Sequence, residues 1–211
     1  MFMPNAYRIK PTSSEERLEK LIIARMNPGA DHAAVDKQIW NLFGEELAVM
    51  FTDLSGFSRG VAAFGIIHFL QIIYESQRVL TPCIDSYGGI LLKVEADSMM
   101  AIFRHPKNAL DCAIEMQRAL KAYNGDKPDT DKILLCVGIG FGQVLRIGDY
   151  EVFGAEVNAA SKLGEDIARS GEILVTEAVQ KVLATGTPLS FTPHPEIPPG
   201  SKAAFLVKYA V

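Results

Sequence analysis

The chain has 211 residues, of which 48% are hydrophobic and 22% are charged. These fractions are typical of a globular protein and exclude a disordered or collagen-like chain. A net charge of −4 gives no basic footprint, so we expect no nucleic-acid partner. No apolar run approaches the ~18 residues of a membrane-spanning helix, and the first residues do not resemble a signal peptide. We therefore expect a cytoplasmic protein with no membrane segment in this chain.

The beginning of the chain carries helical signals and differs from the rest of the sequence. Thr12–Glu16 has the pattern of a helix start, and apolar residues then recur at helical spacing up to Pro28. A second short helix is expected over 32–43, ahead of a glycine that can end it. We therefore expect a helical N-terminal extension, residues 1–45, that packs on the following domain, residues 46–211, or on a partner chain. The end of a signalling linker is the alternative interpretation.

From residue 47 onward, buried strands alternate with amphipathic helices. The expected elements are a strand over 47–53, a helix over 60–87 bent near Pro82, a hairpin of strands 90–94 and 98–103, a helix over 106–123, a strand over 133–142 paired with 143–147, a helix over 156–168, a strand over 173–176, a helix to about 184 and a last strand over 204–209. The order across 47–142 is that of a ferredoxin-like βαββαβ unit, an antiparallel sheet with helices on one face. We predict an α+β fold with this core, extra C-terminal helices and strands, and a short helical N-terminal segment.

Two acidic residues stand at the ends of the expected strands. Asp53 ends the first strand, and Asp97 lies in the turn of the hairpin. The first and third strands of a ferredoxin-like sheet are neighbours, so these carboxylates can converge. Two adjacent carboxylates raise each other's pKa unless a cation lies between them, and Mg²⁺ suits such a site. Taken singly, each acid is better explained as a strand-end residue that caps a helix or as a turn residue, and only the two together point to a metal site.

Three motifs follow one another at consistent separations. They are Phe51-Thr-Asp-Leu-Ser-Gly-Phe-Ser58, Lys93-Val-Glu-Ala-Asp-Ser-Met-Met-Ala101 and Gly148-Asp-Tyr-Glu-Val-Phe-Gly-Ala-Glu-Val-Asn-Ala-Ala-Ser-Lys162. From about residue 47 to 211 the sequence resembles the class III nucleotidyl cyclase catalytic domain, the family of adenylyl and guanylyl cyclases. The resemblance implies a domain that cyclises a nucleoside triphosphate.

The resemblance also implies a metal and phosphate site. Asp53 and Asp97, with the Leu54 carbonyl, would hold two Mg²⁺ (or Mn²⁺) ions per site. These ions would activate the ribose 3′-hydroxyl and neutralise the phosphates. The backbone N–H groups that would face the phosphates, as at a helix N-terminus, belong to Gly56, Phe57 and Ser58.

The remaining implied roles concern the base, the ribose and the α-phosphate. Lys93 and Glu151 fall where the family reads the base, and a lysine with a carboxylate there selects ATP. Asn158 falls on the residue that orients the ribose, and Lys162 on the cation over the α-phosphate. The family usually has arginine at the position of Lys162. It usually has glycine at the position of Ala96.

The activity implied is the cyclisation of ATP to 3′,5′-cyclic AMP and pyrophosphate by a two-metal mechanism. In the family, the metal aspartates of one subunit face the ribose-orienting residue of the other. We therefore expect ATP as the substrate and a homodimer with composite active sites. The alternatives are a catalytically weak or inactive cyclase-homology domain that serves nucleotide binding or dimerisation, and a guanylyl cyclase.

Overall fold

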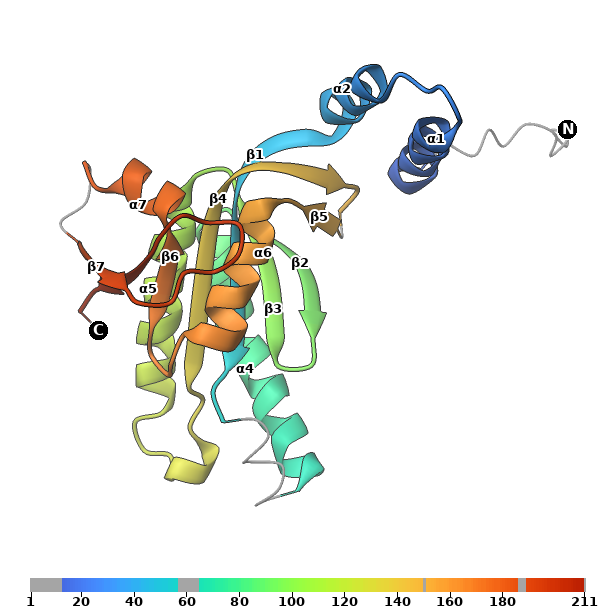
Figure 1. Cartoon of the computed structure of the whole chain (residues 1–211). Coiled ribbons are helices and arrows are strands. Elements are labelled where there is room, and N and C mark those ends of the chain that lie inside the picture. Colours follow the sequence, from blue (N-terminus) through green and yellow to red (C-terminus); the bar gives the residue numbers. More distant parts are fainter. Residues whose placement is uncertain (1–12, 57–64, 150, 186–188, 211) are drawn as a thin grey trace, which may run out of the picture.

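The computed structural model describes residues 13–56, 65–149, 151–185 and 189–210 (Figure 1). The helical segments are α1 (Ser14–Met26), α2 (His32–Phe43), α4 (Ile66–Ser86), α5 (Pro106–Tyr123), the 3₁₀ turn η1 (Asp129–Asp131), α6 (Ala155–Ser161), the π-helical η2 (Lys162–Ile167) and α7 (Glu177–Leu183). The strands are β1 (Gly44–Leu54), β2 (Ile90–Glu95), β3 (Ser98–Phe103), β4 (Leu135–Ile147), β5 (Glu151–Phe153), β6 (Ile173–Thr176), β7 (Ser190–His194) and β8 (Ala204–Lys208).

One mixed sheet organises the molecule and confirms the predicted α+β fold. Its strand order is β2-β3-β1-β4-β6-β8-β7, with β5 paired to β4. The first four strands of this order are antiparallel and have the ferredoxin-like arrangement, whereas β6 runs parallel to β4. Side chains of α4, α5 and α7 share one core cluster on one face of the sheet. The helix α6 lies across the other face (Figure 1).

Glycines let α6 and η2 approach the sheet backbone to backbone. A Cβ atom on Gly138 would lie 2.2 Å from the carbonyl oxygen of Ala160, and one on Gly140 would lie 2.3 Å from that of Glu156. On the helical side, a Cβ on Gly164 would come within 2.8 Å of a β1 carbonyl oxygen. Real Cβ atoms do not tolerate such distances, so the glycine-rich stretch of β4 is a packing surface for this helix.

Two sequence-based expectations for the sheet are wrong. Residues 133–142 and 143–147 do not form a hairpin, because β4 runs straight through them and pairs with β5 instead. The Gly142–Gln143 step resembles a turn, but Gly142 makes room for the side chain of Glu156. The prolines of the segment before the last strand predict a loop, but the segment contains β7 despite Pro193. This strand lies at the sheet edge and pairs with β8 alone, where a missing N–H is tolerated.

The helices agree closely with the sequence-based prediction. α4 continues through Pro82 to Ser86, and the part of the predicted helix between 60 and 64 lies outside the described residues. Capping explains the agreement at α1, where the Ser13 hydroxyl accepts a hydrogen bond from the Glu16 N–H at 3.2 Å. No helix in the described ranges is long and apolar enough to cross a membrane.

The first two helices project from one end of the sheet (Figure 1). They are joined by an Arg25–Asp36 ion pair with Nε and Oδ1 2.6 Å apart, and their apolar side chains pack against Ile147 of β4. α2 ends at Phe43, and its C-cap, Gly44, is the first residue of β1, so no loop separates this helix from the sheet. The division into an extension over 1–45 and a domain over 46–211 stays a prediction.

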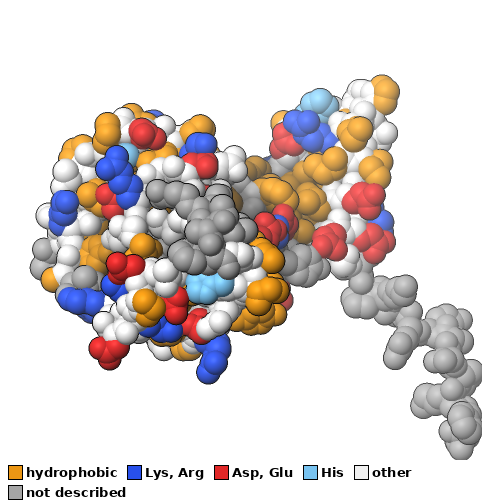
Figure 2. Space-filling model, turned by 90° about the horizontal axis from the view of Figure 1, so that it is seen from below, with side chains coloured by type: hydrophobic (Ala, Val, Ile, Leu, Met, Phe, Trp, Pro, Cys, Tyr) orange, Lys and Arg blue, Asp and Glu red, His pale blue; other side chains and the backbone are white. Residues whose placement is uncertain are grey.

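These two helices also carry apolar side chains on their surface. Ile23, Met26 and Leu42 are each more than half exposed, and Figure 2 shows hydrophobic side chains gathered on the projecting part of the molecule. Exposed apolar surface that is gathered in one place is typical of interaction sites. Packing of the extension on a partner chain, one of the two arrangements expected from the sequence, stays a prediction.

The β2–β3 turn places Ala96 in the left-handed region, with φ of 52°. This conformation costs a residue with a Cβ atom about 1–2 kcal/mol. We predict that Ala96→Gly raises the free energy of unfolding by about 0.5–1 kcal/mol, because part of the gain is offset by the larger entropy of glycine in the unfolded chain. Urea denaturation measures the change.

The matched control is Ala119→Gly, in the interior of α5, where glycine should lower the free energy of unfolding by about 1 kcal/mol. If both variants lost the same free energy of unfolding, the inferred strain at Ala96 would be contradicted.

Candidate active site

The end of β1 and the turn between β2 and β3 bring two carboxylates together. β1 pairs with β3 as far as Thr52 opposite Met99, so Asp53 lies beside the start of β3. The Ser98 hydroxyl donates a hydrogen bond to Asp53 Oδ1 at 3.0 Å. Asp97 lies close enough for its charge to act on Asp53. The topology therefore places both aspartates at one end of the sheet.

Both carboxylates are harder to ionise than a free aspartate. Burial is the main cause that raises the pKa of Asp53 to about 6, and the charge of Asp97 raises it further. The hydrogen bond from Ser98 acts in the opposite direction. Burial also raises the pKa of Asp97, and Glu165 adds negative charge near both groups. The site concentrates negative charge in a partly desolvated place, which favours a proton or a cation.

The donor set fits a hard divalent cation. Among the described residues, no basic side chain forms an ion pair with Asp53 or Asp97. The same part of the chain contains no group of three or more His, Cys, Asp or Glu side chains able to hold a metal. The other ligands would be main-chain, water or phosphate oxygens, a combination that Mg²⁺ accepts. Leu54, whose carbonyl is an expected ligand, directly follows Asp53 at the end of β1, and its side chain is buried in the core cluster that α4 and α5 share.

The loop after β1 begins with an ordered turn. The Ser55 N–H donates a hydrogen bond to the carbonyl oxygen of Leu134 at 2.8 Å, which fixes the loop to the segment before β4. Gly56 has φ of 94°, a left-handed conformation that suits glycine. Of the three residues expected to face phosphates, Phe57 and Ser58 lie outside the described residues.

The structure brings the two expected base-reading residues into contact. Lys93 on β2 and Glu151 on β5 form an ion pair with Nζ and Oε1 2.6 Å apart. Glu95 lies further from the same ammonium, at 3.4 Å. The pKa of Lys93 is raised, chiefly by its hydrogen bond to Glu151. Both side chains remain partly exposed, so a ligand can reach a donor and an acceptor side by side.

Asn158 and Lys162 lie one helical turn apart on the outer face of α6 and η2. Both residues are exposed or partly exposed, while Val157 and Ala160 face the sheet. The Lys162 ammonium forms an ion pair with Asp166 at 2.7 Å. Within the described ranges, no hydrogen bond or ion pair connects Asn158 or Lys162 to the two aspartates.

Sequence reasoning missed two polar neighbours of the aspartates. Ser98 directly follows Asp97, and the pairing register of the hairpin was a sufficient signal for it. Glu165 has no comparable signal, because it lies in η2, where π-helical winding shifts side chains from their α-helical positions. Glu165 also lines a small cavity next to Lys93 and Ser98, and it accepts a hydrogen bond from the Ser161 hydroxyl.

Comparison with known proteins identifies the family. The model of the adenylate and guanylate cyclase catalytic domain matches residues 43–198. An adenylate cyclase of Anabaena cylindrica is 29% identical over 65% of this chain and 31% of its own length. The serine/threonine-protein kinase pkn2 of Myxococcus xanthus is 27% identical over 64% of this chain and 16% of its own length. The chain thus spans less than a third of these curated relatives.

A solved structure shows the same fold. The crystal structure of an adenylate/guanylate cyclase/hydrolase from Silicibacter pomeroyi aligns with a TM-score of 0.67 and 26% identity, covering 77% of this chain and 96% of that chain. The family match extends from the start of β1 into the segment after β7, and it includes both aspartates and the α6–η2 helix. The chain belongs to the adenylate and guanylate cyclase catalytic-domain family.

Proposed function

We propose that the chain converts ATP into 3′,5′-cyclic AMP and pyrophosphate as a homodimer. The observation that carries the proposal is the contact between Lys93 and Glu151, with Nζ and Oε1 2.6 Å apart. An ammonium group can donate to adenine N1, and a neighbouring carboxylate can accept from the adenine amino group. Guanine presents an acceptor at O6 beside donors at N1 and N2, so the same pair can serve guanine, and guanylyl cyclisation is the competing activity.

In this proposal Asp53 and Asp97, with the Leu54 carbonyl, hold two Mg²⁺ or Mn²⁺ ions. When bound, such ions lower the pKa of the ribose 3′-hydroxyl and neutralise the phosphates. The backbone N–H groups that begin at Gly56 face the β- and γ-phosphates. Asn158 orients the ribose.

The Lys162 ammonium meets the charge that develops at the α-phosphate. Among the described residues no hydrogen bond or ion pair joins the aspartates to the outward-facing Asn158 and Lys162, which supports a site shared between two chains. A two-fold dimer built from one kind of chain has two equivalent sites of this kind. Each composite site would take its aspartates from one subunit and its Asn158 from the other.

A second candidate is a nucleotide-binding or dimerisation domain with weak or no turnover. The ion pair between Lys162 and Asp166 favours it, because an ammonium already neutralised by a carboxylate attracts a phosphate less strongly. Lysine also lacks the two-pronged contact of arginine.

Product analysis tests the proposal directly. Purified protein is incubated with ATP or GTP and with Mg²⁺ or Mn²⁺, and the products are identified by chromatography. We expect cyclic AMP and pyrophosphate as the main products. Bound but unchanged nucleotide would favour the second candidate, and cyclic GMP as the main product would reverse the assignment of the base.

Base choice should depend on the Lys93 ammonium. A buried donor or acceptor left unpaired costs about 1–3 kcal/mol, which corresponds to roughly ten- to a hundredfold per mismatched contact. We predict that Lys93→Glu lowers the ratio of kcat/KM for ATP to that for GTP by this factor. The matched control is Glu95→Gln, which removes the more distant carboxylate and should leave the ratio unchanged.

Metal binding should show in thermal stability as well as in activity. The pKa of Asp53 in the folded protein is about 6, above that of a free aspartate, so stability falls as pH rises from about 4 through 6 and this carboxylate ionises. We predict that Asp53→Asn removes this loss: without divalent ions the variant melts above the wild type at pH 8 and level with it near pH 4. Added Mg²⁺ should raise the melting temperature of the wild type, and the Asp53→Asn variant should be inactive.

The control for the metal effect is Asp85→Asn, at an exposed position in the last turn of α4, which should respond to Mg²⁺ as the wild type does. An equal Mg²⁺ response in Asp53→Asn would place the metal elsewhere.

Subunit complementation tests the shared site. Asp53→Ala and Asn158→Ala should each be inactive alone, because every composite site in either homodimer then contains one change. After random subunit exchange, about half of the dimers are mixed, and each has one intact site of two. Activity should therefore return to about a quarter of the wild-type value. Continued inactivity in a mixture with proven exchange would mean that the site lies within one chain.

A further inference from the structure

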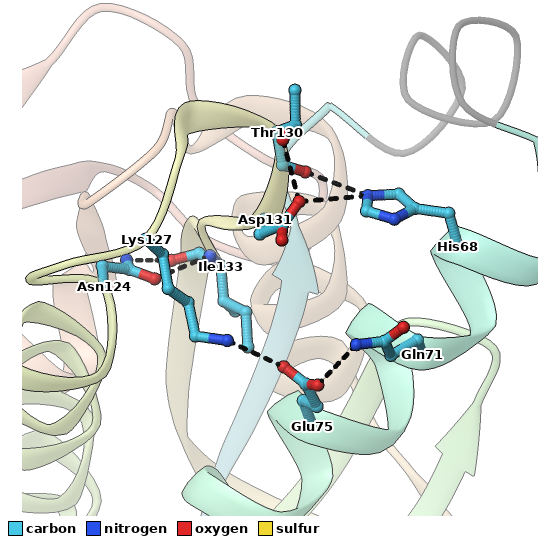
Figure 3. Close-up of polar contacts among 8 residues, drawn as sticks. All are labelled: His68, Gln71, Glu75, Asn124, Lys127, Thr130, Asp131 and Ile133. Atoms are coloured by element: carbon cyan, nitrogen blue, oxygen red, sulfur yellow. Dashed lines mark hydrogen bonds and ion pairs between the residues drawn. The ribbon is translucent and has the colours of Figure 1, made fainter.

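A group of polar contacts joins α4 to the segment between α5 and β4 (Figure 3). Near the start of α4, Nε2 of His68 lies 3.1 Å from the carbonyl oxygen of Thr130 and 3.7 Å from the carboxylate of Asp131. Further along α4, Glu75 accepts a hydrogen bond from the Lys127 ammonium at 3.2 Å. The side chains of Glu75 and Lys127 are only 25% and 30% exposed, so solvent screens this pair less than a surface pair.

The Glu75 carboxylate is also held from its own helix. Gln71 donates a hydrogen bond to it at 2.8 Å, and this bond is the main cause that lowers the pKa of Glu75, ahead of Lys127. The carboxylate therefore stays ionised at neutral pH and has a fixed direction toward Lys127 (Figure 3).

The other end of the segment is connected to the loop after Asp53. The Asn124 side chain donates to the carbonyl oxygen of Ile133 at 2.8 Å and accepts from the Ile133 N–H at 2.9 Å, which closes the segment into a compact loop. The next residue, Leu134, accepts the hydrogen bond from the Ser55 N–H at 2.8 Å. A continuous series of contacts thus runs from Glu75 to a residue two positions after Asp53.

Side-chain packing only partly restrains the loop that follows β1. A cavity of about 180 Å³ lies between residues 54–56, the first turns of α4 and residues 129–134. Ser55 and Leu134 both line this cavity, so the hydrogen bond between them is a direct restraint on the main chain that follows Leu54.

We propose that Glu75 and Lys127 are positioning residues for the cyclase reaction. Their ion pair fixes the 124–134 segment against α4, and this segment holds the Ser55 N–H, so that the same peptide group presents the Leu54 carbonyl, an expected metal ligand, in its productive place. Neither residue contacts substrate in this proposal, which rests on the proposed cyclase function. A displacement of about 1 Å at a reacting group can cost about a hundredfold in rate, so a partial release has a measurable effect.

The first test is catalytic. Glu75→Gln should lower kcat by roughly tenfold, raise the Mg²⁺ concentration for half-maximal rate and leave the preference between ATP and GTP unchanged. The double variant Glu75→Lys with Lys127→Glu exchanges the two charges and should recover most of kcat. The matched control is Lys107→Gln, which breaks an ion pair with Asp111 on α5, outside the 124–134 segment, and should leave kcat unchanged.

The second test does not depend on activity. Hydrogen–deuterium exchange should show faster exchange of the Ser55 amide in Glu75→Gln, but not in Lys107→Gln. If the wild type makes no cyclic nucleotide, the proposed function fails, while the exchange experiment still tests the connection between Glu75 and Ser55. Unchanged Ser55 exchange, or wild-type kcat and Mg²⁺ dependence in Glu75→Gln, would overturn the proposal. So would a charge-exchanged pair with no more activity than the single variant.

Discussion

The close contact between the α6–η2 helix and the sheet is the constraint on which the site depends. Main-chain atoms of the helix lie where Cβ atoms of β4 would otherwise be, so Gly138 and Gly140 are required by sterics. The carboxylate of Glu156 fixes the position along the strand, because it accepts a hydrogen bond from the Phe141 N–H at 3.1 Å. With its inner face pressed on the sheet, the helix can present Asn158 and Lys162 only outward. Every feature of the site that involves this helix depends on that contact.

The aspartate pair is unfavourable for the protein without a ligand. Asp53 and Asp97 are partly buried, have raised pKa values and have no basic partner among the described residues. The strand that carries Asp53 has a fully buried middle, with Ala48, Val49 and Met50 at 0% exposed. A strand with such packing can tolerate a local electrostatic cost at its end. This arrangement is typical of functional sites, where a local rule is broken and the surrounding core compensates.

The sequence predicts best what local chemistry determines. Capping residues and periodicity define α1, α2 and α5 almost to the residue, and the topology that they imply brings Asp53 to Asp97. The hairpin expected near Gly142 is wrong because a glycine that admits a helix looks the same in sequence as a glycine that makes a turn. The π-helical winding at Glu165 occurs where Gly164 packs against Gly138, a long-range contact that cannot be read locally. The Lys162–Asp166 pair, four positions apart on a helix, was readable from spacing alone.

The junction between α2 and β1 has a mechanical consequence. Gly44 caps the helix and begins the strand. A Cβ atom there would lie 2.4 Å from the Trp40 carbonyl oxygen, so the helix and the strand join tightly, with no linking residue between them. From Gly44 the strand runs roughly 30 Å to Asp53, at about 3.3 Å per residue, with hydrogen-bonded neighbours along its length. Such a strand is stiff, because its hydrogen bonds to the neighbouring strands resist both sliding and stretching. The first two helices and Asp53 therefore stand at opposite ends of one continuous hydrogen-bonded strand.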